Sequence, residues 1–278
     1  MKRLVTGVFI LALTISQLSF ADTSPRAELN TNSANARLSP PLSLAGGSRL
    51  DLVSPQQWIP LARKLSRHLE KVHDEYSQLF GPIPAVQTTL KLIEAEKFYR
   101  QTGAPRWTNA MYYKGEISIP LSLSETVDLE NLNRSVKHEY THAVIHALSD
   151  GRCPGWLDEG IAQWAEGAVN PALEPSLREW VIKRQSPISF KFLQGGFTRL
   201  ANEMVAPAYG ESLFASQMAI ESFGFRRIGR YLELLREGKP KNDAFTESFG
   251  VSEAGFETAL NAALSKWARN PKAHLTLH

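Results

Sequence analysis

The segment His138-Glu139-Tyr140-Thr141-His142 places two imidazoles and a carboxylate at a spacing that can do chemistry. On a helix, residues four apart lie on the same face, so His138 and His142 can bind one Zn²⁺ at about 2.0–2.1 Å. Glu139 lies about 100° around the helix. From there it can reach a water at an open coordination position and act as general base. The alternative is a helix whose histidines cap or pack without a metal.

A catalytic zinc needs a third protein ligand, and the next segment offers one. The sequence PGWLDEGIAQWAEG, residues 154–167, contains Glu159 at the start of a predicted helix. Two antiparallel helices joined by a loop would place Glu159 opposite the histidine pair. Asp158 points about 100° away from Glu159 and is the weaker candidate. Glu166 shares the face of Glu159, and we expect it to support a ligand or the fold.

Three other residues near the motif compete for roles at the site. His146 lies about 80° from His138 around the helix axis. It also lacks the spacing and the glycine turn of the metzincin pattern, so we expect it to pack or face solvent. Gln163 lies one turn after Glu159 and would orient a ligating histidine through its outer ring N–H. We expect Cys153 to be an inert thiol in the loop.

HExxH followed by a P-x-W-L-x-E-G-x-A-x-x-x-E segment resembles the gluzincin metallopeptidases, specifically the peptidase MA-like domain family. The resemblance covers roughly residues 85–268 and is strongest over 136–167. It implies one Zn²⁺ per chain and Glu139 as the catalytic base. The zinc ligands that it implies are His138, His142 and Glu159. The small residues Gly160 and Ala162 match the family's E-G-x-A pattern, and their size would allow close helix packing.

Two further segments resemble parts of the same group. The segment 208–213, AYGESL, resembles the Y-x-x-S segment that opens a later helix, so Tyr209 is the candidate donor to an oxyanion. The alternative is a tyrosine packed at a helix start. The segment 109–112, NAMY, resembles the edge strand of thermolysin-like enzymes. This implies that Asn109 and the backbone of Ala110 contact substrate, unless the strand is an ordinary sheet edge.

The elements that must position these residues follow from the hydrophobic pattern. Strand patterns precede helix patterns, which predicts an α+β fold: a small mixed or antiparallel sheet with an exposed edge strand, the HExxH helix and a mostly helical C-terminal half, zincin-like. The predicted elements are a strand at 49–53, a helix ending near Phe80 and starting at Pro55 or Pro60, a strand at 88–95, a hairpin at 110–120, the motif helix at 129–149, and helices at 157–167, 177–184, 211–223, 226–237, 243–248 and 253–268. His68, His73, His274 and His278 lie outside these motifs, and we expect them on the surface.

The first residues, MKRLVTGVFILALTISQLSFADTS, combine a positive start, an apolar stretch and small residues before Ala21. This is typical of a secretory signal peptide over residues 1–21, and the apolar run is short for the alternative, an uncleaved anchor. We therefore expect a periplasmic or secreted protein without a stable membrane span after cleavage near Ala21. Residues 22–47 are predicted to be a disordered leader. Residues 48–270 form the predicted peptidase domain, α/β to about residue 150 and helical afterwards.

Composition sets limits on the class of protein. The formal net charge of the 278 residues is only +3, which does not indicate nucleic acid as a partner. One cysteine excludes an internal disulfide. The predicted function is a zinc-dependent peptidase acting on a peptide or protein. Two alternatives remain: a non-catalytic, zinc-stabilised binding or assembly module of the cell envelope, and a zinc amidase acting on cell-wall peptides.

Overall fold

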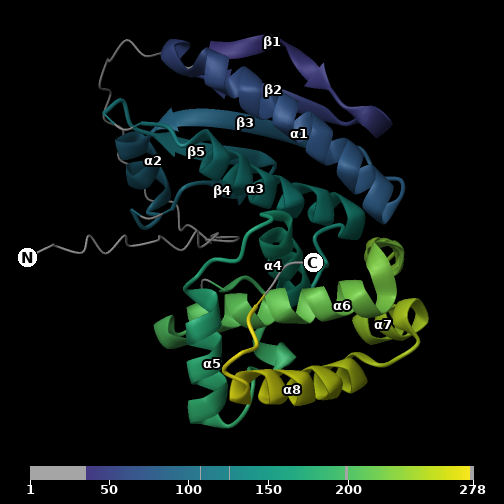
Figure 1. Ribbon diagram of the computed structural model, residues 1–278. Coiled ribbons are helices and arrows are strands. Elements are labelled where there is room, and N and C mark those ends of the chain that lie inside the picture. Colours follow the sequence, from purple (N-terminus) through teal and green to yellow (C-terminus); the bar gives the residue numbers. More distant parts are fainter. Residues whose placement is uncertain (1–35, 107, 125, 198–199, 276–278) are drawn as a thin grey trace, which may run out of the picture.

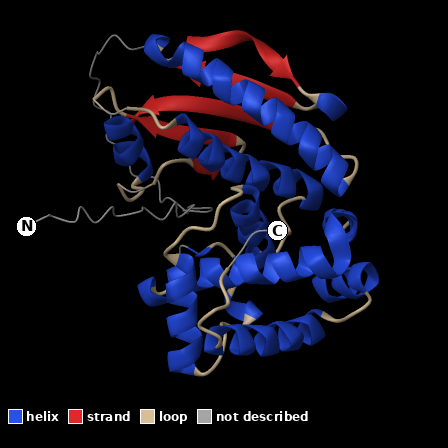
Figure 2. Ribbon diagram, in the orientation of Figure 1, coloured by secondary structure: helices blue, strands red, loops and turns tan. Residues whose placement is uncertain are grey.

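The computed structural model describes residues 36–275 except 107, 125, 198 and 199. The predicted signal peptide, residues 1–21, lies outside the described residues. A sheet with helices on it forms the first half of the chain, and the second half is helical (Figures 1 and 2). In the described part of the chain, no helix combines the length and the apolar character needed to cross a bilayer.

The sheet has five strands in the order β1-β2-β3-β5-β4. The strands are β1 (Ala36–Ser43), β2 (Arg49–Ser54), β3 (Gln87–Glu94), β4 (Met111–Tyr113) and β5 (Glu116–Leu121). Strands β2, β3 and β5 run parallel, and β1 and β4 pair antiparallel with their neighbours. The sheet is therefore mixed, and β4 is an edge strand, as the sequence predicts.

The disordered leader predicted for residues 22–47 is wrong from Ala36 onward. Strand β1 pairs with β2 and places Leu38 opposite Leu52. A 3-10 helix, Ala45–Gly47, follows, and its Ala45 carbonyl accepts a hydrogen bond at 3.1 Å from Nε2 of His73. His73 is thus buried, contrary to the surface position expected from the sequence. The segment is ordered by its pairing with β2 and by Leu38, Leu42 and Leu44, which pack on the core.

Helices α1 (Ile59–Phe80) and α3 (Leu129–Ser149) lie side by side on one face of the sheet, and α2 (Ala95–Thr102) follows β3 (Figure 1). Helix α1 has Pro60 in its first turn, where the missing N–H costs nothing. Of the two prolines that could fill the first turn, Pro60 does so, and Pro55 precedes the helix, which starts at Ile59. Asp128 caps α3 by accepting hydrogen bonds from two backbone N–H groups of its first turn. The motif thus sits in a stable, fully formed helix.

Two buried hydrogen bonds join α3 to α1. The Tyr76 hydroxyl lies 2.6 Å from Oγ1 of Thr141, and the Tyr140 hydroxyl lies 2.9 Å from Nδ1 of His73. On α3, both hydrogen bonds are made by residues of the HExxH segment, Tyr140 and Thr141, whose side chains face α1. They fix the rotation of α3 about its axis, so that the histidines face away from α1.

The helical half contains α4 (Gly155–Ala165), α5 (Leu173–Arg184), α6 (Asn202–Arg236), α7 (Lys241–Phe249) and α8 (Glu253–Arg269). Helix α6 changes direction at Gly224, whose φ is 75°, where the sequence predicts a break between two helices. Helix α4 packs against α3 on one side and α6 on the other. A Cβ at Gly160 would overlap the carbonyl oxygen of Ser212 and the hydroxyl of Ser216 on α6. Gly160 therefore lets α4 approach α6 closely, as expected for a small residue there.

We expect Gly160→Ala to destabilise the protein by about 1–3 kcal/mol, because a rigid backbone carbonyl opposes the added methyl. Gly195→Ala is the matched control, since nothing lies within 4 Å of its Cβ position. Denaturant unfolding of both variants measures the difference. Equal stability of the two variants would show that α4 and α6 can separate without cost.

Candidate metal centre

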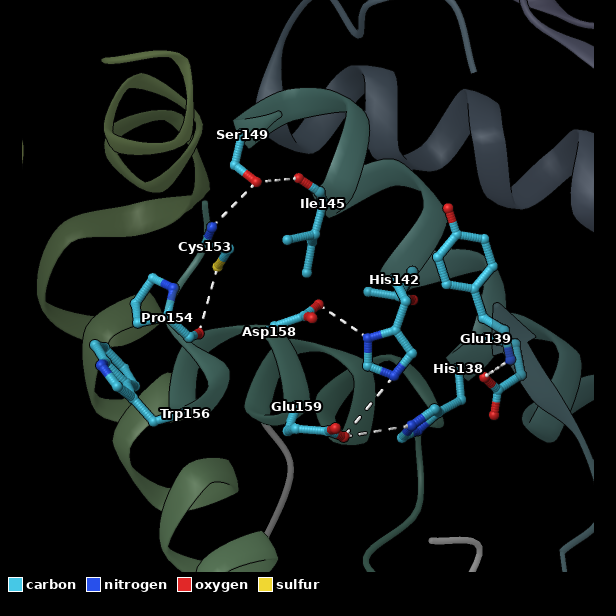
Figure 3. Close-up of polar contacts among 12 residues, drawn as sticks. His138, Glu139, His142, Ile145, Ser149, Cys153, Pro154, Trp156, Asp158 and Glu159 are labelled. Carbon is cyan, nitrogen blue, oxygen red and sulfur yellow. Dashed lines mark hydrogen bonds and ion pairs between the residues drawn. The ribbon is translucent and has the colours of Figure 1, made fainter. Parts of the chain in front are cut away.

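Three buried side chains from two helices converge in the space between α3 and α4 (Figure 3). Oε2 of Glu159 lies 3.9 Å from Nε2 of His138 and 3.8 Å from Nε2 of His142. One ligand atom from each residue lies within 4.8 Å of the others. The structure thus brings together the three residues that the sequence nominates as ligands, from α3 and from the loop-connected α4.

The outer nitrogen of each imidazole is held by a carboxylate. Nδ1 of His138 lies 2.6 Å from Oε1 of Glu166, and Nδ1 of His142 lies 2.9 Å from Oδ1 of Asp158. A carboxylate at Nδ1 keeps the proton there and leaves Nε2 with its lone pair. Both rings are therefore held in the tautomer that presents Nε2 to a metal.

The inner nitrogens have no comparable contact. Nε2 of His138 and Nε2 of His142 are buried and have no hydrogen-bond partner within the described residues. Donors about 2.0–2.2 Å from a tetrahedral zinc lie roughly 3.3–3.6 Å from one another, close to the distances found here. Two imidazoles and one carboxylate are also a donor set that zinc accepts. The residues therefore fit a zinc ion.

The electrostatics of the site favour positive charge. Burial alone would lower the pKa of both histidines. For His138 the carboxylate of Glu166 more than offsets burial, so its pKa is raised. For His142, Asp158 and Glu159 together raise the pKa to about 10. The same carboxylates that favour a bound proton would favour a divalent cation.

Glu139 lies beside the three residues without joining them (Figure 3). Its Oε2 accepts a hydrogen bond at 2.7 Å from the backbone N–H of Tyr112, on the edge strand β4. Burial raises the pKa of Glu139, although His138, His142 and this N–H oppose the shift. The side chain is thus a buried carboxylate fixed at one oxygen, which suits proton transfer through the other.

Tyr209 is buried in the early turns of α6, with its ring edge-on to Phe197 at 5.0 Å. It is three residues before Ser212, so it shares the face of α6 that packs on α4 next to Glu159. Its role as oxyanion donor stays a prediction.

The roles of the neighbouring polar residues differ partly from expectation. Asp158 and Glu166 hold the outer nitrogens of the two histidines, which confirms the supporting position expected of Glu166. The expectation that Gln163 orients a histidine is wrong, since both outer nitrogens are occupied by these carboxylates. The signal for Asp158 is its position one residue before Glu159, which turns it toward the far side of His142. His146 is exposed, as expected. Cys153 directs its thiol at the Pro154 carbonyl, and burial raises its pKa, so it is unreactive.

Comparison with known proteins gives a family and a fold. The sequence model of the Peptidase MA superfamily matches residues 99–266, more than half of the chain. The structure is similar to aminopeptidase A of Legionella pneumophila in complex with aspartic acid, with a TM-score of 0.55 and 13% identity over 82% of this chain. An M1 zinc metallopeptidase of Deinococcus radiodurans gives a TM-score of 0.46 and 14% identity over 87% of this chain. No sequence among curated proteins matches significantly.

The chain spans only 28% of the Legionella protein and 54% of the Deinococcus protein. At 13% identity the first likeness shows the fold alone, and it confirms the predicted α+β, zincin-like architecture.

We expect wild-type protein to bind one zinc per chain, and Glu166→Gln or Asp158→Asn to weaken zinc affinity roughly 10–100-fold, because each loses the charge that orients a histidine. Glu179→Gln, an exposed carboxylate on α5, is the control. Competition with a chromophoric chelator measures the affinity. If all three variants bind zinc as tightly as wild type, the outer carboxylates do not support the ligands.

Proposed function

The chain belongs to the Peptidase MA superfamily, and we propose that it is a zinc-dependent peptidase that hydrolyses a peptide or protein substrate. The family match confirms the resemblance that the motifs indicate. The observation that carries the proposal is the pair of buried Nε2 atoms that face Glu159 and have no hydrogen-bond partner among the described residues, with each Nδ1 held by a carboxylate. A helix whose histidines merely pack would have no need of this arrangement.

In the proposed mechanism, His138, His142 and Glu159 would hold the zinc, which when bound polarises a carbonyl and acidifies a water. Glu139 takes a proton from the water and delivers it to the leaving amine. Burial raises the pKa of Glu139, which makes its carboxylate a stronger base toward the water. Tyr209 donates a hydrogen bond to the oxyanion that develops at the carbonyl.

We also propose that the protein acts outside the cytoplasm, in the periplasm or the medium, after cleavage near Ala21. The positive start and short apolar stretch of the first residues support this location.

We expect Glu139→Gln to lower kcat by about 10²–10⁴-fold and to retain zinc, because the amide cannot accept the proton and Glu139 is not a ligand. Cleavage of a peptide library with and without chelator, together with metal analysis, measures both quantities. Parallel assays with cell-wall peptides separate a peptidase from an amidase. Zinc binding without cleavage of either substrate by wild type would favour the binding-module alternative.

The edge strand β4 positions the base in this scheme. Lys114 and Gly115 form a two-residue turn with positive φ, so Tyr113 and Glu116 are the hydrogen-bonded pair next to it. Tyr112, opposite Ile117, is then a non-hydrogen-bonded position whose N–H points away from β5. That outward N–H is the one that binds Glu139.

We expect Tyr112→Pro to lower kcat roughly 10–100-fold with little change in KM, because it removes the N–H that orients Glu139. Proline is tolerated in an edge strand where the N–H faces outward. Tyr112→Ala is the control, since it also loses the ring but keeps the amide. Steady-state kinetics that give equal kcat values for the two variants would remove the amide from the mechanism.

A further inference from the structure

A groove of about 350 Å³ runs between α1 and α3, on the side of α3 away from α4. Its lining residues are Lys64, Arg67, His68, Lys71, Leu129 and Asn133. The two helices run in the same direction here, since Lys137 further along α3 pairs with Glu75 further along α1 at 3.1 Å. The groove therefore lies at the start of the α1–α3 seam, and that ion pair lies further along it.

The four basic residues of the groove are spaced like one face of a helix. Lys64, Arg67, His68 and Lys71 follow the i, i+3, i+4, i+7 pattern, so their side chains are neighbours. Like charges at these spacings cost about 0.2–0.5 kcal/mol per pair. Lys64, Arg67 and Lys71 form no ion pair with any described residue. The repulsion among these three cations is therefore not offset by an ion pair in the described part of the chain.

The helix dipole makes this placement less favourable still. A helix favours acidic residues in its first turns and basic residues in its last turns. Helix α1 has no acidic residue in its first turn and no basic residue in its last, and most of its cations fall in the first half. Neither helix stability nor ion pairing within the described chain accounts for this row of basic residues along α1. An anion bound in the groove would offset the repulsion.

His68 adds a neutral ring to the cations. Its Nε2 is buried and has no hydrogen-bond partner in the described part of the chain. Burial and the nearby Lys137 lower its pKa, whereas the Asn133 carbonyl and Glu75 act in the opposite direction. The neutral ring therefore adds no positive charge to the repulsion among the lysines and the arginine.

We propose that this groove binds a phosphate group. A phosphate monoester carries about −1.5 to −2 charges at neutral pH and three acceptor oxygens, and a phosphodiester headgroup carries a single negative charge. Either group matches three cations without an ion pair in the described chain, beside a neutral amide donor. Arg67 can bind two oxygens at once, whereas Lys64 and Lys71 act as point charges. The Asn133 amide completes the set of donors. The phosphate comes from a soluble ester or from the headgroup of an anionic lipid, and the site is independent of the metal centre.

The test compares two triple variants of the full chain with equal changes in charge. Lys64→Gln/Arg67→Gln/Lys71→Gln removes the groove cations, and Lys266→Gln/Arg269→Gln/Lys272→Gln removes two lysines and an arginine that are exposed at the other end of the molecule. Glutamine is a good helix former, so the folds should survive. One arm titrates inorganic phosphate against chloride at constant ionic strength and follows the unfolding midpoint and the His68 ring resonances. The other arm sediments phosphatidylglycerol and phosphatidylcholine vesicles.

We expect phosphate to raise the midpoint and to shift the His68 resonances in wild type and in the control variant, with affinity at least tenfold weaker in the groove variant. Binding to phosphatidylglycerol vesicles that is stronger than to phosphate, and lost in the groove variant, would assign the group to a lipid headgroup. Equal responses of the two variants in both arms, or no response of wild type in either, would overturn the proposal.

Discussion

The site rests on a single constraint: two buried imidazole nitrogens each lie 3.8–3.9 Å from the same buried carboxylate oxygen. Polar atoms in such a position are costly unless something satisfies them, and the nitrogens find no hydrogen bond in the described chain. A cation between them removes the cost, because all three atoms then point their lone pairs at it. The carboxylates of Glu166 and Asp158 support this arrangement from outside. Each keeps a proton on Nδ1 of its histidine, so that Nε2 is free to face the cation.

The geometry needs α3 to be fixed on two sides at once. On one side, Tyr140 and Thr141 bond to His73 and Tyr76 of α1, which sets how the helix is rotated. On the other side, α4 carries Glu159 and is itself pressed against α6 at Gly160. Residues of the same five-residue motif thus serve the core and the site. This explains why Tyr140 and Thr141 bear polar groups although they face away from the histidines.

The sequence predicts what depends on local spacing. The i, i+4 histidines, the Lys114-Gly115 turn and the helix break near Gly224 are properties of a few adjacent residues, and the structure has each of them. The position of Glu159 required a comparison with a family, because the loop between two helices does not determine how they pack. The sequence did not predict that residues 36–43 form an ordered strand or that His73 is buried, since both depend on partners far away in the sequence. The choice of Glu166 over Gln163 is likewise decided by tertiary packing.

The sheet takes part in the proposed chemistry through one backbone atom. The turn at Lys114 and Gly115 sets the register of β4 against β5, and a slip by one residue would turn the Tyr112 N–H inward to the ladder. Glu139 would then lose its hydrogen bond at Oε2 and would keep only its burial, which leaves a mobile and more strongly protonated carboxyl. The ligands come from α3 and α4, the candidate oxyanion donor from α6, and the contact that orients the base from β4. A metal could therefore bind to the two helices alone, whereas the proposed hydrolysis also requires the sheet half and the helical half to be folded against each other.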